Sequence, residues 1–85
     1  MDSTANREIA REHLELANRH LAEGQKRIGR QIELIAELER DGHGTAQAKE
    51  LLKQFEETLA LQVKTRDRIV RELAETQDAS PWKRA

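Results

Sequence analysis

The 85-residue chain contains no cysteine, so neither a disulfide bond nor a thiolate metal site can stabilise its fold, and no thiol nucleophile is available. Aromatic residues make up only 2% of the chain, and its single proline is Pro81, so no proline interrupts helix formation before that point. A chain this short buries only about 60–65% of the surface that its unfolded form exposes. Packing must therefore stabilise the fold.

A strong net charge is also missing. The 15 Lys and Arg residues nearly balance the 16 Asp and Glu residues, which gives a formal net charge of −1 and no overall attraction to nucleic acid or to an anionic membrane. No apolar run approaches the ~20 residues that span a bilayer, and the N-terminal stretch MDSTANRE lacks the basic and apolar parts of a secretory signal. We therefore expect a cytoplasmic protein with no membrane partner.

What the chain does contain is charge and regular apolar spacing. Charged residues make up 36% of it, a composition typical of long helices and coiled coils. In the first half of the chain, apolar or small residues and one glutamine recur in alternating steps of three and four, which is the heptad pattern of a helix packed on another helix. This first seam consists of Leu14, Ala17, Leu21, Gly24, Ile28, Gln31, Ile35 and Leu38. It predicts a helix over about residues 6–40.

The same pattern returns after a short break. The second seam consists of Ala48, Leu52, Phe55, Leu59, Gln62, Arg66, Ile69 and Leu73. It predicts a second helix over about residues 46–77, and each helix would be about 50 Å long at 1.5 Å per residue. Residues 79–85 are expected to form a flexible tail, because Pro81 disfavours continued helix. The sequence leaves open whether Trp82 in this tail docks to a partner or folds back onto the helices.

Residues 41–45 are predicted to form the turn between the helices. Gly42 lies where the first helix needs a residue in the left-handed conformation, and Thr45 can cap the next helix. His43 and Gly44 complete the link. A connection this short favours antiparallel neighbours, so residues 1–78 are expected to form one all-α domain, a long antiparallel αα-hairpin of coiled-coil type.

If the hairpin closes between residues 43 and 44, two residues face each other when their residue numbers add up to about 87. Gly24 then faces Gln62 or Val63, and Leu21 lies near Arg66. Since this places a glycine and two polar residues side by side, the middle of the rod is expected to be its weakest-packed part.

The helices carry more apolar surface than one neighbour can cover. Further apolar residues widen each stripe beyond its seam, and together they would form a larger exposed strip than a monomer usually tolerates. We therefore predict a homodimer, an antiparallel four-helix bundle with a two-fold axis near the middle of the rods. The candidates for its interface are Ile9, Leu16, Ile32, Leu34, Leu51, Val63 and Val70.

Polar seam residues fit two interpretations. Gln31, Gln62 and Arg66 can fix the register and the oligomeric state if they are paired. Alternatively, Arg66 lies at the edge of the seam, with its stem along the core and its guanidinium in water.

Charge is segregated along the predicted rod. The turn end is acidic, which can select the orientation of a dimer. A basic belt lies nearer the middle and could grip phosphates, although no aromatic residues interleave with it and no known DNA-binding pattern is present. The belt consists of Arg19, Lys26, Arg27, Arg30, Lys64, Arg68 and Arg71.

The chain offers few candidates for chemistry. His13 and His20 lie two turns apart on one face, a spacing too long for two imidazoles of one helix to share a metal ion easily. Neither belongs to the Glu-x-x-His motif of di-iron bundles. No nucleophile or carboxylate pair stands out, because the carboxylates alternate with bases as helix-stabilising pairs do. We expect no enzyme activity and no cofactor.

One stretch resembles a known group of proteins. Residues 20–69, with Gly24, Ile28 and Gln31, the turn Gly42-His43 and the run LLKQFEETL, are similar to small uncharacterised helical-hairpin proteins of alphaproteobacteria such as rhizobia. Many of those proteins carry a polar residue where this chain has Gly44, and the glycine would make the turn looser here. The resemblance implies a bacterial cytoplasmic hairpin and no particular activity.

The leading hypothesis is therefore a non-enzymatic homodimer that interacts with itself and with another protein, in a regulatory or structural role. A nucleic-acid-associated protein that uses the basic belt is the alternative. A metal- or ligand-binding bundle that uses His13 and His20 is the third.

Overall fold

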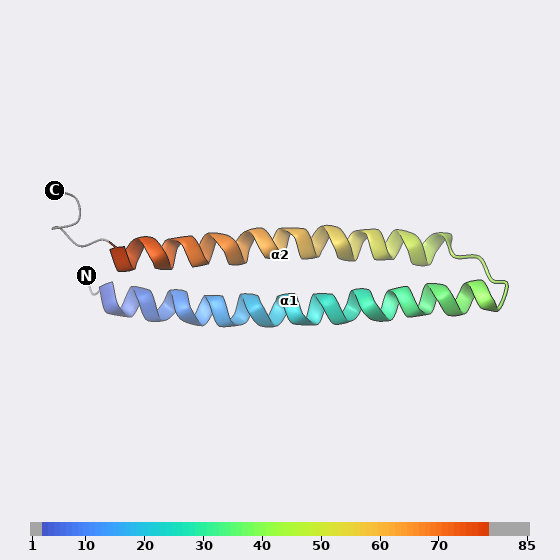
Figure 1. The fold of residues 1–85 in the computed structure, drawn as a ribbon, viewed down its shortest axis with the longest axis horizontal. Helices are drawn as coiled ribbons and strands as arrows, with labels where there is room; N and C mark the ends of the chain where they lie inside the picture. The colour runs from blue at the N-terminus through green and yellow to red at the C-terminus, as the bar shows by residue number, and fades with distance from the viewer. Residues whose placement is uncertain (1–2, 79–85) are drawn as a thin grey trace.

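The computed structural model describes the backbone of residues 3–78 and the side chains of residues 5–75. Two helices, α1 (Ser3–Arg40) and α2 (Ala46–Asp78), make up the fold, and residues 3–78 contain no strand. The prediction of an all-helical hairpin is confirmed, because α1 and α2 lie side by side along their whole length (Figure 1). The expected tail, with Pro81 and Trp82, lies outside the described residues.

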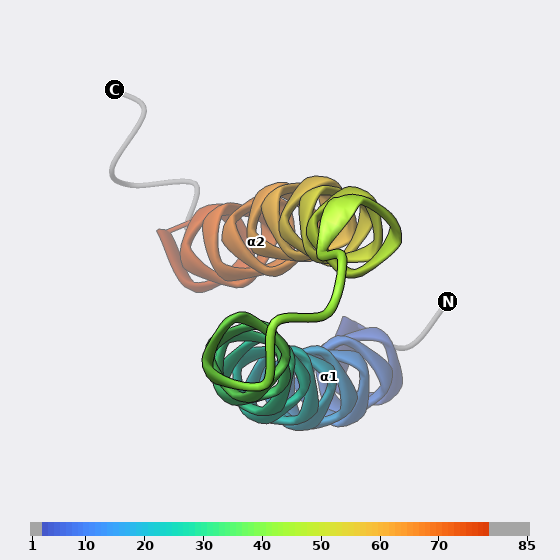
Figure 2. The ribbon, with the colours of Figure 1, turned by 90° about the vertical axis from the view of Figure 1, so that its right-hand side faces the viewer.

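The hairpin is a single layer of two helices. Seen from the turn end, α1 and α2 cross at a shallow angle, and no other described element covers either side of the pair (Figure 2). All sixteen seam residues predicted from the heptad pattern are buried or half-buried in the contact. The alternation of three and four residues thus decides which stripe of each helix packs, as in a coiled coil.

The turn forms as its glycine requires. Gly42 adopts a φ of 74°, its N–H donates to the carbonyl of Glu39 at 3.2 Å, and the N–H of His43 donates to the carbonyl of Leu38 at 2.9 Å. This pair of bonds is the Schellman motif, which satisfies the last carbonyls of α1. At the start of α2, the carbonyl of Thr45 accepts a bond from the N–H of Lys49 at 2.9 Å, as an N-cap residue does.

The middle of the rod, where the sequence predicted the weakest packing, contains the best-buried apolar residues of the described part, beside the buried and unpaired Gln62 Oε1. Ala17 and Leu21 are the two buried apolar residues of the described part, with 9% and 8% of their surface exposed. A Cβ added to Gly24 would lie 3.1 Å from Gln62 Oε1 and 3.2 Å from Leu59 Cδ1. Because Ala17 and Gly24 are small, the helices approach closely here and the larger Leu21 fills the contact between them.

Candidate functional site

The most unusual feature of the hairpin is how little of its apolar surface is buried. Among the described residues no large side chain is fully buried, and Ala17 and Leu21 are the buried apolar positions. Seven large apolar side chains are 40–64% exposed, and they are Ile9, Leu16, Ile32, Leu34, Leu51, Leu61 and Val70. A contiguous exposed strip of such residues marks an interaction surface.

The heptad spacing places five of these seven side chains on one side of the hairpin. Ile9 lies one heptad before Leu16, and Leu34 lies two heptads after His20. On α2, Leu51 lies one heptad before Thr58, and Leu61 lies three residues after it. Residues that share a heptad position, or occupy the position beside it, face the same way along a packed helix. These residues of α1 and α2 form one surface only if both helices turn them to the same side of the hairpin.

Three shallow hollows between the helices place Leu16 and Leu61 on the same side, and heptad position assigns Ile9, Leu34 and Leu51 to that side as well. A hollow of about 250 Å³ is lined by Ala17, His20, Thr58, Leu61, Gln62 and Thr65. A hollow of about 350 Å³ continues it toward the open end, with His13 and Leu16 of α1 beside Thr65 and Arg68 of α2. A third, of about 190 Å³, continues it toward the turn, beside Arg27 and Thr58. We call this side of the hairpin the groove face.

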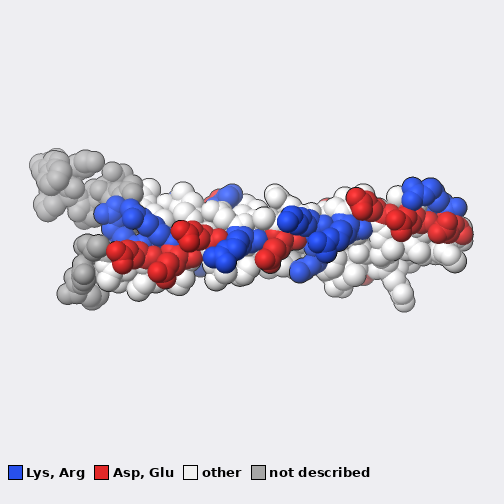
Figure 3. Space-filling view, turned by 90° about the horizontal axis from the view of Figure 1, so that it is seen from below, with Lys and Arg blue, Asp and Glu red and all other residues white. Residues whose placement is uncertain are grey.

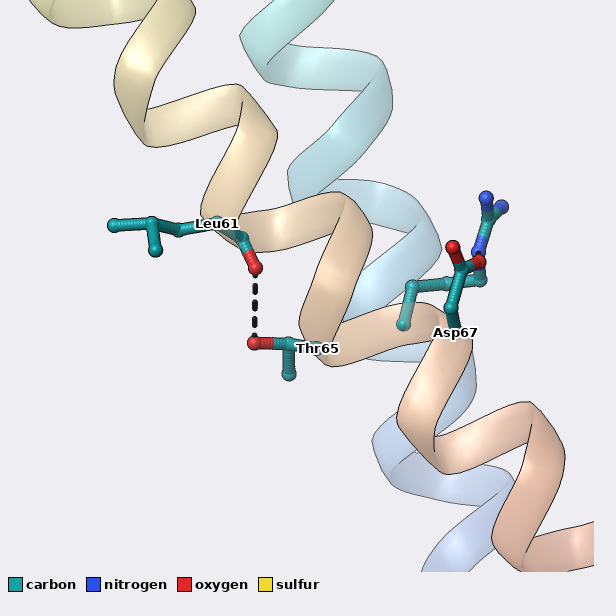
Figure 4. A network of polar contacts seen from close by, with 4 residues as sticks. Leu61, Thr65 and Asp67 are labelled. Atoms are coloured by element: carbon teal, nitrogen blue, oxygen red, sulfur yellow. Dashed lines mark hydrogen bonds and ion pairs between the residues drawn. The ribbon is translucent and has the colours of Figure 1, made fainter.

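The groove face is mainly apolar or neutral at its centre. The hydroxyl of Thr65 donates to the carbonyl of Leu61 at 3.1 Å, so this donor already has an acceptor within α2. Leu61 projects outward from α2 just beside this bond (Figure 4). The guanidinium of Arg27 lies 5.5 Å from the centre of the Phe55 ring, a cation–π contact that holds its stem along the helix.

The opposite side carries fewer exposed apolar groups. Ile32 and Val70 are exposed there, whereas Val63 is half-buried between the helices. An ion pair between Glu39 and Lys49, at 3.5 Å, joins α1 to α2 on this side. The seven interface candidates from the sequence therefore divide between two faces, with Ile9, Leu16, Leu34 and Leu51 on the groove face. Sequence reasoning missed Leu61, the most exposed of the large apolar residues.

The polar seam residues act inside the hairpin. Gln31 is 7% exposed, and its Nε2 donates to the carbonyl of Ala48 at 2.9 Å. Arg66 follows the edge-of-seam interpretation, because its side chain is 34% exposed and its Nε lies 2.7 Å from Oδ1 of the exposed Asp67. Gln62 Oε1 is buried and accepts no hydrogen bond within the described residues. Gln31 and Arg66 therefore have their partners within one chain.

The structure does not bring the basic belt together as one surface. Lys64, Arg68 and Arg71 line a hollow formed by α2 alone, together with Asp67. Arg68 also lies 3.9 Å from Glu72, and Arg27 lies over Phe55. On the face drawn in Figure 3, Lys and Arg groups alternate with Asp and Glu groups along the rod. The alternative that depends on a continuous belt thus gains no geometric support.

The two histidines of α1 line the groove face. His13 and His20 share the hollow of about 350 Å³ with Glu72. Within the part of the chain that the structure describes, no three His, Cys, Asp or Glu side chains come together in a way that could hold a metal ion. The geometry assigns both residues to an exposed, partly apolar surface.

Comparison with known proteins adds no relative. No protein-family model, curated protein or solved structure matches the chain. Neither described helix has a segment long and apolar enough to cross a membrane. The groove face is therefore the feature of the hairpin that indicates a function.

Proposed function

We propose that the chain is a non-enzymatic interaction protein of the bacterial cytoplasm that acts as a homodimer, a four-helix bundle of two hairpins. In this bundle, a second layer of helices covers the apolar side chains that the hairpin leaves in water. The charged outer surfaces of the rods stay exposed and engage another protein.

The observation that supports this proposal most directly is the imbalance between buried and exposed apolar groups. The described part of the hairpin buries Ala17 and Leu21, yet seven large apolar side chains are exposed. At ~25 cal/mol per Å² of buried apolar area, against about 1.5 kcal/mol of conformational entropy for each ordered residue, a small domain without a full core has almost no net stability. A second copy is the simplest source of the missing contact area.

The shape of the hairpin also favours a dimer. A single layer of two helices has no interior beyond one seam, so its area per unit mass is high. Stacking two such layers turns one outer face of each into core.

Unfolding at different protein concentrations tests the proposal. If folding and dimer formation are coupled, the urea midpoint rises with protein concentration, because mass action favours the folded dimer. Circular dichroism at 222 nm follows the transition over a hundredfold concentration range. A midpoint that does not change over that range would contradict a homodimer.

A further inference from the structure

We propose that the groove face receives a second copy of the chain lying antiparallel, with α1 packed on the partner's α1 and Ile9 of each copy packed on the partner's Leu34. This inference depends on the proposed dimer and adds its face, its direction and its contacts. It follows from where the apolar residues of α1 lie relative to the middle of the helix.

The apolar residues of α1 are placed symmetrically. The midpoint of α1 (Ser3–Arg40) falls between residues 21 and 22, and Ile9 and Leu34 lie at equal distances on either side of it. A two-fold axis through that midpoint, perpendicular to the rod and within the interface, reverses the rod and keeps α1 opposite α1. It therefore places Ile9 of one copy at the height of Leu34 of the other.

The same axis gives compatible neighbours along the rest of α1. His20 and Glu23 are also equidistant from the midpoint, so the imidazole of one copy faces the carboxylate of the other. Leu16 faces Arg27, whose guanidinium is already held over Phe55, so that its aliphatic stem is free to cover the leucine. The groove face of α1 thus pairs an imidazole with a carboxylate and a leucine with an arginine stem, and farther from the axis His13 faces Arg30, so no two carboxylates meet.

The same axis crosses α2 between Lys64 and Thr65, because Gly24 lies against Gln62 and residue numbers at one height therefore sum to about 86. Each Leu61 lies roughly 5 Å from the axis toward the turn end, so the two copies lie about 10 Å apart along the rod. The exposed Leu61 is therefore close to the centre of the face that the partner covers, beside Thr58 and Thr65 of the central hollow.

A parallel pair of hairpins fits less well. An axis along the rods would place α1 on the partner's α2 at the same height, where Leu34 would meet Leu51 and Leu16 would meet Arg68. It would also place the two acidic turn ends side by side, where like charges repel. The acidic residues of one turn end are Glu33, Glu37, Glu39, Asp41, Glu50, Glu56 and Glu57, against Arg40, Lys49 and Lys53.

The groove face is large enough for a stable contact. A helix of 38 residues is about 55 Å long, and two helices side by side are about 20 Å wide, which gives a face on the order of 1,000 Å². A standard protein interface buries about 800 Å² on each partner.

Spin labels can test direction and face together, because a chain without cysteine accepts single thiols at chosen positions. The labelled variants are Ile9→Cys and Leu61→Cys on the groove face, and Val70→Cys on the opposite face as the matched control. All three residues are exposed in the hairpin, so each variant should keep its helix content. Double electron–electron resonance then gives the distance between the two copies.

The antiparallel arrangement predicts a distance of about 40 Å between labels at position 9, since they lie about 25 residues apart along the rod. Labels at position 61 should lie within about 20 Å of each other, given helix spacings of 8–10 Å. The nitroxide should be immobilised at position 61 and mobile at position 70.

The outcomes separate this inference from the proposed dimer. A dimer in which labels at position 9 lie within about 20 Å of each other is parallel, and one that immobilises position 70 but not position 61 uses the other face. Either result overturns the inference and leaves the homodimer standing. A molar mass of one chain overturns both.

Discussion

The side-chain amide of Gln31 on α1 donates a hydrogen bond of 2.9 Å to the backbone carbonyl of Ala48 on α2. Gln31 is buried and lies where the heptad pattern calls for an apolar residue. A buried glutamine is tolerated only where its donors find an acceptor, so this bond favours the hairpin register that brings Ala48 within reach.

Replacing Gln31 should therefore destabilise the hairpin by more than the lost side-chain volume alone would, because a buried hydrogen bond is lost as well. Gln31→Ala removes the bond and leaves a gap in the seam, at an expected cost of about 1–3 kcal/mol. The exposed Gln25 offers the matched control, where Gln25→Ala should change stability by less than about 0.5 kcal/mol. Urea denaturation at one fixed protein concentration measures both, and equal effects would remove the role assigned to Gln31.

The turn should depend on one of its two glycines. Gly42 has a φ of 74°, a conformation in which a Cβ costs about 1–2 kcal/mol, so Gly42→Ala should lower stability by that amount. Gly44 has no positive φ and open space around it, so Gly44→Ala should be neutral or slightly stabilising. Thermal unfolding of the two variants compares them directly. A Gly44→Ala variant as unstable as Gly42→Ala would disprove this account of the turn.

The two glycines within α1 should also respond differently. A Cβ at Gly29 meets nothing within 4 Å, so Gly29→Ala should stabilise the helix by about 1 kcal/mol, or about 4–8 °C in Tm. A Cβ at Gly24 would press on Gln62 and Leu59, so Gly24→Ala should lose most or all of that gain. Differential scanning calorimetry resolves such a difference. Equal gains would show that the helices are not held closely at Gly24.

A buried charge should unfold the hairpin directly, whereas a charge on the groove face should act only through the dimer. Leu21 is 8% exposed, so Leu21→Glu buries an unpaired carboxylate, at a cost that exceeds the stability of so small a domain. In Leu61→Glu the same group stays in water within one hairpin, so this variant should lose less helix than Leu21→Glu at the same protein concentration. Circular dichroism separates the two. A folded Leu21→Glu variant would contradict the assigned seam.

The sequence predicted the seams well because heptad spacing directly reflects which side of a helix packs. All the seam residues from Leu14 to Leu73 are buried or half-buried, and Gly24 contacts Gln62 as the register required. The sequence did not show how side-chain size and direction would arrange the middle of the rod. Ala17 and Gly24 allow a close approach that buries Leu21, and Arg66 turns to Asp67 instead of weakening the centre.

The candidate site was predicted only in part. The exposure of an apolar residue on one helix does not show on which side of the helix pair that residue lies. Leu61 has polar neighbours in its own stripe, so no apolar run identified it. Its heptad position on α2, the one that Ile9 and Leu16 occupy on α1, was the available signal. The residues of the basic belt do not share one surface for a related reason, since nearness along the rod does not place side chains on one face.

The central claim is that two hairpins must pair to cover their apolar surface, and molar mass in solution tests it most directly. Light scattering on the wild-type chain should give twice 9.8 kDa, and Leu61→Glu should shift the mass toward 9.8 kDa and lower the helix content, because one hairpin alone has little net stability. A folded wild-type chain that scatters as a single 9.8 kDa particle at high concentration would contradict the account.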